Sequence, residues 1–229
     1  MRSYRKLLAL LLALVLALGL ISGCGGNDRD RDDDDDARES AAVEPDEGIP
    51  DDAEPQLDPD DALSDAEIRE LLGSLPDAFI FTSGAGAWGT ELTIAPDGTF
   101  TGMFHDSEMG AIGDENPNGE VYICEFSGAF TDFRRVSDTV YTMRLERLDT
   151  VGTPDEYYID DGIKFIYADP YGMDDADVFY LYLPGTPRAD LPEGFLSWVR
   201  LEEGVDALPD DLFGLYNEGG EQGYYAYAD

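Results

Sequence analysis

Apolar and polar residues alternate with a period of two through much of the chain after residue 88, and no other feature of the sequence constrains the fold as strongly. Side chains spaced in this way point to opposite faces of a β-strand, so one face of each strand is expected to be buried. The alternating segments are 88–94, 100–104, about 120–131 and about 139–148. Residues 163–167 and 178–183 are apolar almost throughout, which predicts strands that are buried more fully.

Local signals for a turn and a helix accompany this pattern. Pro96-Asp97-Gly98 predicts a tight turn, because Pro presets φ and Gly accepts a positive φ. Ser64 and Glu67 form a capping box, so we expect a short helix over about 65–73 at the start of a folded domain, residues 64–229.

The sequence therefore predicts an all-β, mostly antiparallel domain of about eight to ten strands, with a short N-terminal helix. Residues 196–201 are expected to form a strand or a short helix that leads into one, and residues 216–227 a closing hairpin or strand. Antiparallel meander pairing is expected because no helix long enough for a crossover separates the strands. Both a barrel and a sandwich fit.

One short stretch favours the barrel. Residues 84–104 contain Gly86-Ala87-Trp88 and, at the turn, Asp97-Gly98-Thr99-Phe100. This stretch resembles the first hairpin of lipocalin-like bacterial domains. The resemblance implies a barrel and nothing about activity.

The first 24 residues carry a targeting pattern. A basic start, residues 1–6, precedes the apolar run 7–21, which ends at Ser22-Gly23-Cys24. The run is shorter than the roughly 20 residues of a spanning helix and suits a signal peptide. The pattern resembles the lipobox signal peptide of bacterial lipoproteins, which implies a removed signal peptide at 1–23, lipidation of Cys24 and anchoring on the extracytoplasmic side of the cell membrane. An ordinary secretory signal is the alternative, but its A-x-A-like site is absent.

The net charge of the chain limits the classes of molecule that it can bind. The chain has 51 Asp and Glu against 14 Lys and Arg, a formal net charge of -37. Such acidity excludes nucleic acid as a natural partner, since phosphate binding needs clustered Lys and Arg. Residues 24–63 are acidic, rich in Pro and without aromatic residues, so they are expected to form a disordered linker. The expected partners are the membrane, through the lipid anchor, and an unknown ligand or envelope protein.

One acidic loop matches the calcium-loop pattern D-x-[DN]-x-[DN]-G-x5-E. The matching ligand positions are Asp114, Asn116, Asn118 and Glu125, whose side-chain oxygens suit a hard cation. An EF-hand needs flanking helices, however, and the composition that follows Gly119 is typical of a strand. The alternative is a polar connection between strands built on the Asn-Gly turn. Calcium is the only cofactor that the sequence suggests.

A second acidic loop lies between the apolar segments 163–167 and 178–183. It places Asp174, Asp175 and Asp177 close together in the chain. Such a loop could bind a cation or a sugar, since loops on rigid scaffolds often carry function. The alternative is a solvated acidic loop in an acidic protein.

No catalytic constellation is evident. His105, the only His, is out of phase with Phe100 and Phe104 and is expected at the surface, while Cys124 lies on an apolar face and is expected to be buried and inert. The sequence favours a non-catalytic binding or structural module. The alternatives are a cell-envelope hydrolase acting on glycans or peptides and a calcium-stabilised surface interaction module.

The interior of the domain distinguishes two roles for such a module. A cavity lined by aromatic side chains would support capture of a ligand. A filled interior would favour a structural or interaction role. The side chains expected to line such a cavity are Trp88, Phe100, Tyr122 and Tyr141.

Metabolic labelling with palmitate should tag the protein, and Cys24→Ala should abolish the tag, because the acyl chains of this class of lipoprotein attach to that sulfur. In-gel detection of the label measures the outcome. Cys124→Ala is the matched control and should leave the label unchanged. Wild-type protein that takes up no label would contradict the assignment.

Overall fold

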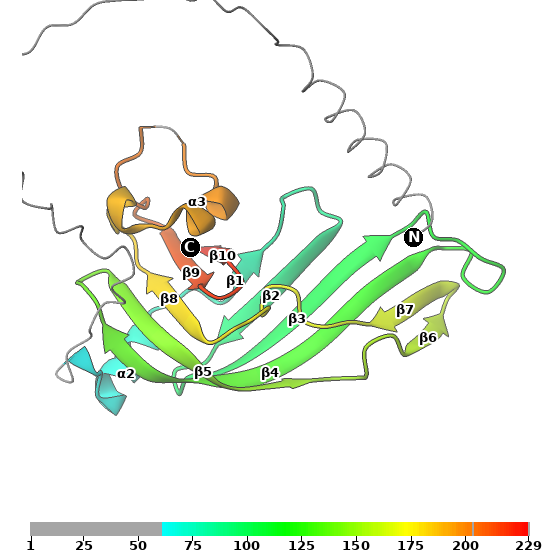
Figure 1. The fold of residues 1–229 in the computed structure, drawn as a ribbon, viewed down its shortest axis with the longest axis horizontal. Coiled ribbons are helices and arrows are strands. Elements are labelled where there is room, and N and C mark those ends of the chain that lie inside the picture. The colour runs from blue at the N-terminus through cyan, green and yellow to red at the C-terminus, as the bar shows by residue number, and fades with distance from the viewer. Residues whose placement is uncertain (1–60, 203, 229) are drawn as a thin grey trace, which may run out of the picture. The chain divides into compact units, whose positions relative to one another are not determined.

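The computed structural model describes residues 61–202 and 204–228 (Figure 1). The predicted signal peptide, Cys24 and nearly all of the predicted acidic linker lie outside these residues, so they stay predictions. Within the described residues, no helix is both long and apolar enough to cross a membrane.

The predicted helix and turn are confirmed. Helix α2 (Asp65–Leu72) begins at the capping box, where the Glu67 N–H donates to Ser64 Oγ at 3.4 Å and the Ser64 N–H donates to a Glu67 carboxylate oxygen at 2.9 Å. At the turn, Gly98 has a φ of +83° and its N–H donates to the Ala95 carbonyl at 3.0 Å. Both features follow from local sequence.

In the described part of the chain ten strands follow α2, with a short 3-10 turn and helix α3 between the eighth and ninth strands. These elements are β1 (Phe79–Phe81), β2 (Trp88–Ile94), β3 (Thr99–Glu108), β4 (Glu120–Arg135), β5 (Val140–Thr150), β6 (Tyr157–Asp160), β7 (Ile163–Tyr167), β8 (Val178–Tyr182), η2 (Arg188–Asp190), α3 (Glu193–Val199), β9 (Leu212–Asn217) and β10 (Gln222–Tyr227). Strands β1 and β6 were not predicted, and β4 is longer than the segment of about 120–131 expected for it.

Eight of the strands close into a barrel. In the order β1-β2-β3-β4-β5-β8-β9-β10 each strand pairs antiparallel with the next, and β10 pairs back to β1 at Tyr225 and Ile80. The all-β, mostly antiparallel fold is therefore confirmed, and it is a barrel rather than a sandwich. Neighbouring strands follow chain order, as in the predicted meander.

Strand β4 extends beyond the barrel and carries a hairpin there. β3 pairs with β4 between Glu120 and Ala129, whereas β5 pairs only between Phe126 and Arg135. The backbone edge that β5 leaves is taken by β7, which pairs parallel with residues 120–123, and β6 pairs antiparallel with β7. This β6–β7 hairpin lies at the end of β3 and β4 that is away from α2 (Figure 1).

Aromatic side chains fill the interior of the barrel. The ring centroid of Phe130 lies 4.7 Å from that of Phe100 and 5.0 Å from that of Phe179. The buried aromatic residues of this core are Phe79, Phe81, Phe100, Phe104, Phe126, Phe130, Phe133, Tyr141, Phe179 and Tyr224. Packed rings of this kind supply most of the hydrophobic stabilisation of a domain.

The two apolar segments differ in burial. Strand β8 has Phe179, Leu181 and Tyr182 buried, as predicted. In β7 only Ile166 is buried, so the prediction of a more fully buried strand is wrong there. The reason is its position outside the barrel, where water reaches the sheet.

One outer side of the barrel is covered by α3. The apolar cluster beneath it comprises Val140, Tyr182, Leu191, Phe195, Leu208, Leu212 and Tyr216. Gly214 makes room for this contact, since a Cβ there would lie 2.3 Å from the Phe195 ring. Residues 193–199 are therefore helical, and the predicted continuation into a strand at about 201 is wrong. Among the described elements, neither helix covers the outer side chains of β1–β4 in this way.

Phe81→Ala should lower the free energy of unfolding by about 3–5 kcal/mol, because it removes a fully buried ring from the core. Its centroid lies between 4.6 and 5.2 Å from four other aromatic rings. Chemical denaturation followed by fluorescence measures the change. The control Thr93→Ala, at an exposed outward position of β2, should stay within about 0.5 kcal/mol of wild type. Equal effects of the two substitutions would contradict the packing described.

Candidate functional site

The aromatic residues considered for a ligand cavity belong to packed clusters. Phe100 and Tyr141 are buried in the core, and the ring centroids of Trp88 and Phe81 lie 5.1 Å apart. Tyr122 is half-buried, and burial together with the nearby carboxylates raises its pKa. None of the four lines the two outer hollows described next. The interior thus has the packing of a core.

Two adjoining shallow hollows, of about 380 and 310 Å3, lie on the uncovered outer face of β1–β4. Glu91 and Met103 line both. The register places Met103 directly between Glu91 on β2 and Glu125 on β4. An exposed thioether flanked by two carboxylates offers an apolar surface under negative charge, which suits a cationic group on an apolar stem.

The same face continues from the barrel onto the hairpin. Strand pairing places His105, Ile123 and Tyr167 in one row across β3, β4 and β7, and Val121, Phe165 and Tyr158 in the next row. Cys124 points into the core, so its chain neighbour Ile123 points to the outer face. The other side chains of the two rows lie on the same face as Ile123, because paired residues share a face of the sheet. We define the open face as Glu91, Met103, His105, Val121, Ile123, Glu125, Tyr158, Phe165 and Tyr167, all exposed or half-buried.

The β6–β7 hairpin is the part of this surface that sequence reasoning missed. Asp161 and Gly162 connect its strands with φ values of +46° and +74°, which is the geometry of a two-residue hairpin turn. The Tyr158 ring stacks on Phe165 with centroids 5.0 Å apart. An Asp-Gly pair between two β-prone runs is a strong hairpin signal, so the dipeptide could have revealed the hairpin.

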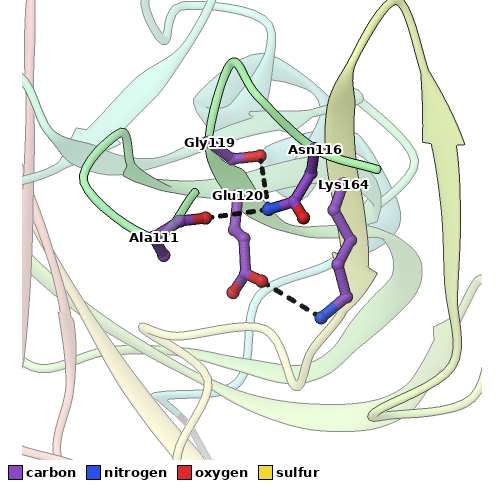
Figure 2. A network of polar contacts seen from close by, with 5 residues as sticks. All are labelled: Ala111, Asn116, Gly119, Glu120 and Lys164. Atoms are coloured by element: carbon purple, nitrogen blue, oxygen red, sulfur yellow. Dashed lines mark hydrogen bonds and ion pairs between the residues drawn. The ribbon is translucent and has the colours of Figure 1, made fainter. Parts of the chain in front are cut away.

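The calcium-pattern residues lie next to this hairpin. The Asn116 amide Nδ2 donates to the carbonyls of Ala111 at 2.8 Å and Gly119 at 3.5 Å (Figure 2). The Asn118 Nδ2 donates to the Asp161 carbonyl at 2.8 Å and so ties the loop to the hairpin turn. These contacts form a polar connection between the loop and the hairpin.

The other two residues of the pattern lie apart from these contacts. Asp114 is exposed in the loop, and the exposed Glu125 belongs to the open face on β4. Within the described residues, no group of three or more His, Cys, Asp or Glu is placed to hold a metal ion. Calcium binding stays a prediction, which calorimetry with calcium tests.

An ion pair fixes β7 to β4. Lys164 Nζ lies 3.1 Å from a Glu120 carboxylate oxygen (Figure 2), and the two half-buried residues are direct partners in the parallel pairing. The Lys164 ammonium also lies 4.9 Å from the centroid of the Tyr157 ring, within cation–π range. This lysine is therefore already neutralised within the domain.

The second acidic loop is held to the barrel by its aspartates. Asp174 accepts a hydrogen bond from the Gln222 amide, and its own N–H donates to Gln222 Oε1 at 3.2 Å. Asp177 accepts two hydrogen bonds from Arg144, at 2.6 and 2.7 Å. Asp175 is exposed, with a φ of +47°. The structure thus directs Asp174 and Asp177 to different protein partners, and a cation at this loop stays a prediction.

His105 and Cys124 lie as the sequence predicts. His105 is exposed on the open face, whereas Cys124 is fully buried. They occupy neighbouring strands but opposite faces of the sheet, so their side chains cannot form a nucleophile–base pair. Burial, with added effects from Asp169 and Glu125, raises the pKa of the Cys124 thiol to about 11.

Searches with the whole chain match no family model, no curated protein and no solved structure. The resemblances to bacterial lipoproteins and to lipocalin-like domains therefore stay predictions from the sequence.

In the Cys24→Ala variant, in which Cys124 is the only thiol, iodoacetamide at pH 8 should leave the native protein unmodified and alkylate the unfolded protein fully. The thiolate is the reactive species, and burial both shields the sulfur and raises its pKa to about 11. Intact-mass measurement before and after addition of urea gives the readout. Rapid alkylation of the native protein would contradict the burial.

Proposed function

We propose that this chain is a lipid-anchored extracytoplasmic protein whose β domain is a non-catalytic interaction module, and that partners bind its open face. The observation that carries the proposal is the difference between the surfaces of the barrel. Its interior is filled by aromatic rings and one outer side is covered by α3, whereas the described residues leave apolar side chains of the open face exposed or half-buried. Contiguous exposed apolar surface rimmed by charge is typical of interaction sites.

The charge of the domain supports a protein or small ligand as the partner. Residues 64–229 carry 34 acidic and eight basic residues, so nucleic acid would be repelled. Glu91 and Glu125 flank the exposed Met103, which favours a partner that brings both apolar and cationic groups.

The anchoring part of the proposal rests on the signal-peptide pattern at 1–23 and on Cys24. Each buried CH2 of an acyl chain contributes roughly 0.8 kcal/mol, so two or more chains hold a domain on a membrane durably. Anchoring confines the open face to the layer next to the membrane, where an envelope protein or ligand can meet it.

Site-specific photo-crosslinking in intact cells tests the interaction role. A photoreactive amino acid at Met103 should give discrete adducts, because the side chain is exposed on the open face between Glu91 and Glu125. The matched control position is Glu193, exposed on α3 on the covered side of the barrel, where no adduct is expected. Equal adducts at both positions, or none at Met103, would overturn the proposal.

A further inference from the structure

The described sheet has one terminal strand, and it is β6. The sheet order ends β4-β7-β6, and among the described strands β6 pairs with β7 alone. An edge strand presents unpaired backbone N–H and C=O groups that can accept another strand. We infer that β6 is a docking edge for an extended, basic segment of a partner polypeptide, which adds as a further strand beside it. This inference rests on the proposed interaction role and names the partner's chemistry.

The hydrogen-bond pattern identifies the backbone groups that face the edge. The Tyr167 N–H donates to the Glu156 carbonyl at 2.9 Å, so these two residues form a bonded pair of the β6–β7 ladder. Bonded and non-bonded pairs alternate in an antiparallel ladder. Tyr158 and Asp160 are therefore bonded towards β7, while Tyr157 and Ile159 direct their N–H and C=O groups to the edge.

The side chains of β6 are also available to an added strand. The exposed fractions of Tyr157, Tyr158 and Ile159 are 57%, 43% and 39%. Tyr158 lies on the open face with Phe165, whereas Tyr157 and Ile159 lie on the opposite face with Lys164. An added strand would thus gain apolar contacts on both of its faces. The strand contains neither Pro nor Lys, residues that commonly protect an edge.

Charge selects a basic occupant. The acidic pair Asp155 and Glu156 precedes β6, and the pair Asp160 and Asp161 closes it, and all four residues are exposed. Lys164, which lies opposite Ile159 on β7, is paired with Glu120. Two β6 strands paired antiparallel would set these acidic pairs against each other, so charge disfavours a second copy. A segment with Lys or Arg flanking apolar residues complements both ends of the strand.

Hydrogen exchange on the full chain tests the inference with a defined probe. The probe is a blocked hexapeptide of alternating lysine and valine, and the comparison peptide alternates glutamate and valine. We expect the lysine peptide to slow exchange at the Tyr157 and Ile159 amides, measured residue by residue by NMR. The glutamate peptide should bind at least about tenfold more weakly, because it replaces attraction at both acidic pairs by repulsion.

Two variants separate backbone pairing from charge. Ile159→Pro removes an N–H that faces the edge and no ladder bond, so it should abolish the protection at Tyr157. The double substitution Asp160→Asn with Asp161→Asn leaves the backbone in place and should weaken binding several-fold. Its matched control is Asp210→Asn with Asp211→Asn, at exposed positions away from β6, which should bind the lysine peptide as wild type does.

A lysine peptide methylated on the backbone nitrogens of alternate residues keeps its charge but loses the N–H groups with which it would donate to the backbone carbonyls of β6. It should lose the protection, a result that does not depend on how well Ile159→Pro folds. Absence of protection by the unmodified peptide, equal binding of the glutamate peptide, or dimers of the protein with these amides already protected would each overturn the inference. Crosslinking at Met103 is independent of these outcomes, so the proposed function can stand where the docking edge fails.

Discussion

The backbone ladder along β4 is the constraint on which both the barrel and the hairpin depend. Its second half pairs with β5 and so helps to close the barrel, while its first half runs past the point where β5 ends. An unpaired backbone edge there would be left beside an apolar strand, and β7 satisfies it by parallel pairing, with Lys164 and Glu120 reinforcing the contact. The open edge is thereby transferred outward from β4 to β6. The barrel and the proposed docking edge are two consequences of one long strand.

Stability and surface charge have separate origins in this domain. Apart from Lys164–Glu120, the ion pairs Arg134–Asp132, Arg144–Asp177 and Arg147–Asp149 are exposed or partly exposed, and such pairs contribute only about 0–1 kcal/mol each. The aromatic core therefore stabilises the fold, while most acidic side chains remain uncompensated. Excess negative charge keeps a protein soluble and repels copies of itself. An apolar surface can remain exposed under those conditions without causing self-association.

How much of the structure follows from the sequence depends on the range of the interactions involved. The α2 capping box, the turn at Gly98 and the alternation in β2 and β3 are local, and all were predictable. Helix α3 was only partly predictable, because Phe195 is positioned by Gly214 on a strand distant in sequence. The open face could not be predicted, since the row of His105, Ile123 and Tyr167 exists only once the register of three strands is set. The Asp161-Gly162 turn, in contrast, is a local signal that could have revealed β6, but it was missed.

The two asparagines of the calcium-loop pattern also order the loop and tie it to the β6–β7 hairpin. Asn116 and Asn118 donate through their Nδ2 atoms to backbone carbonyls, and the acceptor for Asn118 is Asp161 in the hairpin turn itself. Together with the Glu120–Lys164 pair, these contacts hold the hairpin against β4. A pre-ordered edge lowers the entropy that must be lost when a strand is added to it. The contacts of Asn116, Asn118 and the Glu120–Lys164 pair therefore help to hold β6 in the extended geometry that pairing with another strand requires.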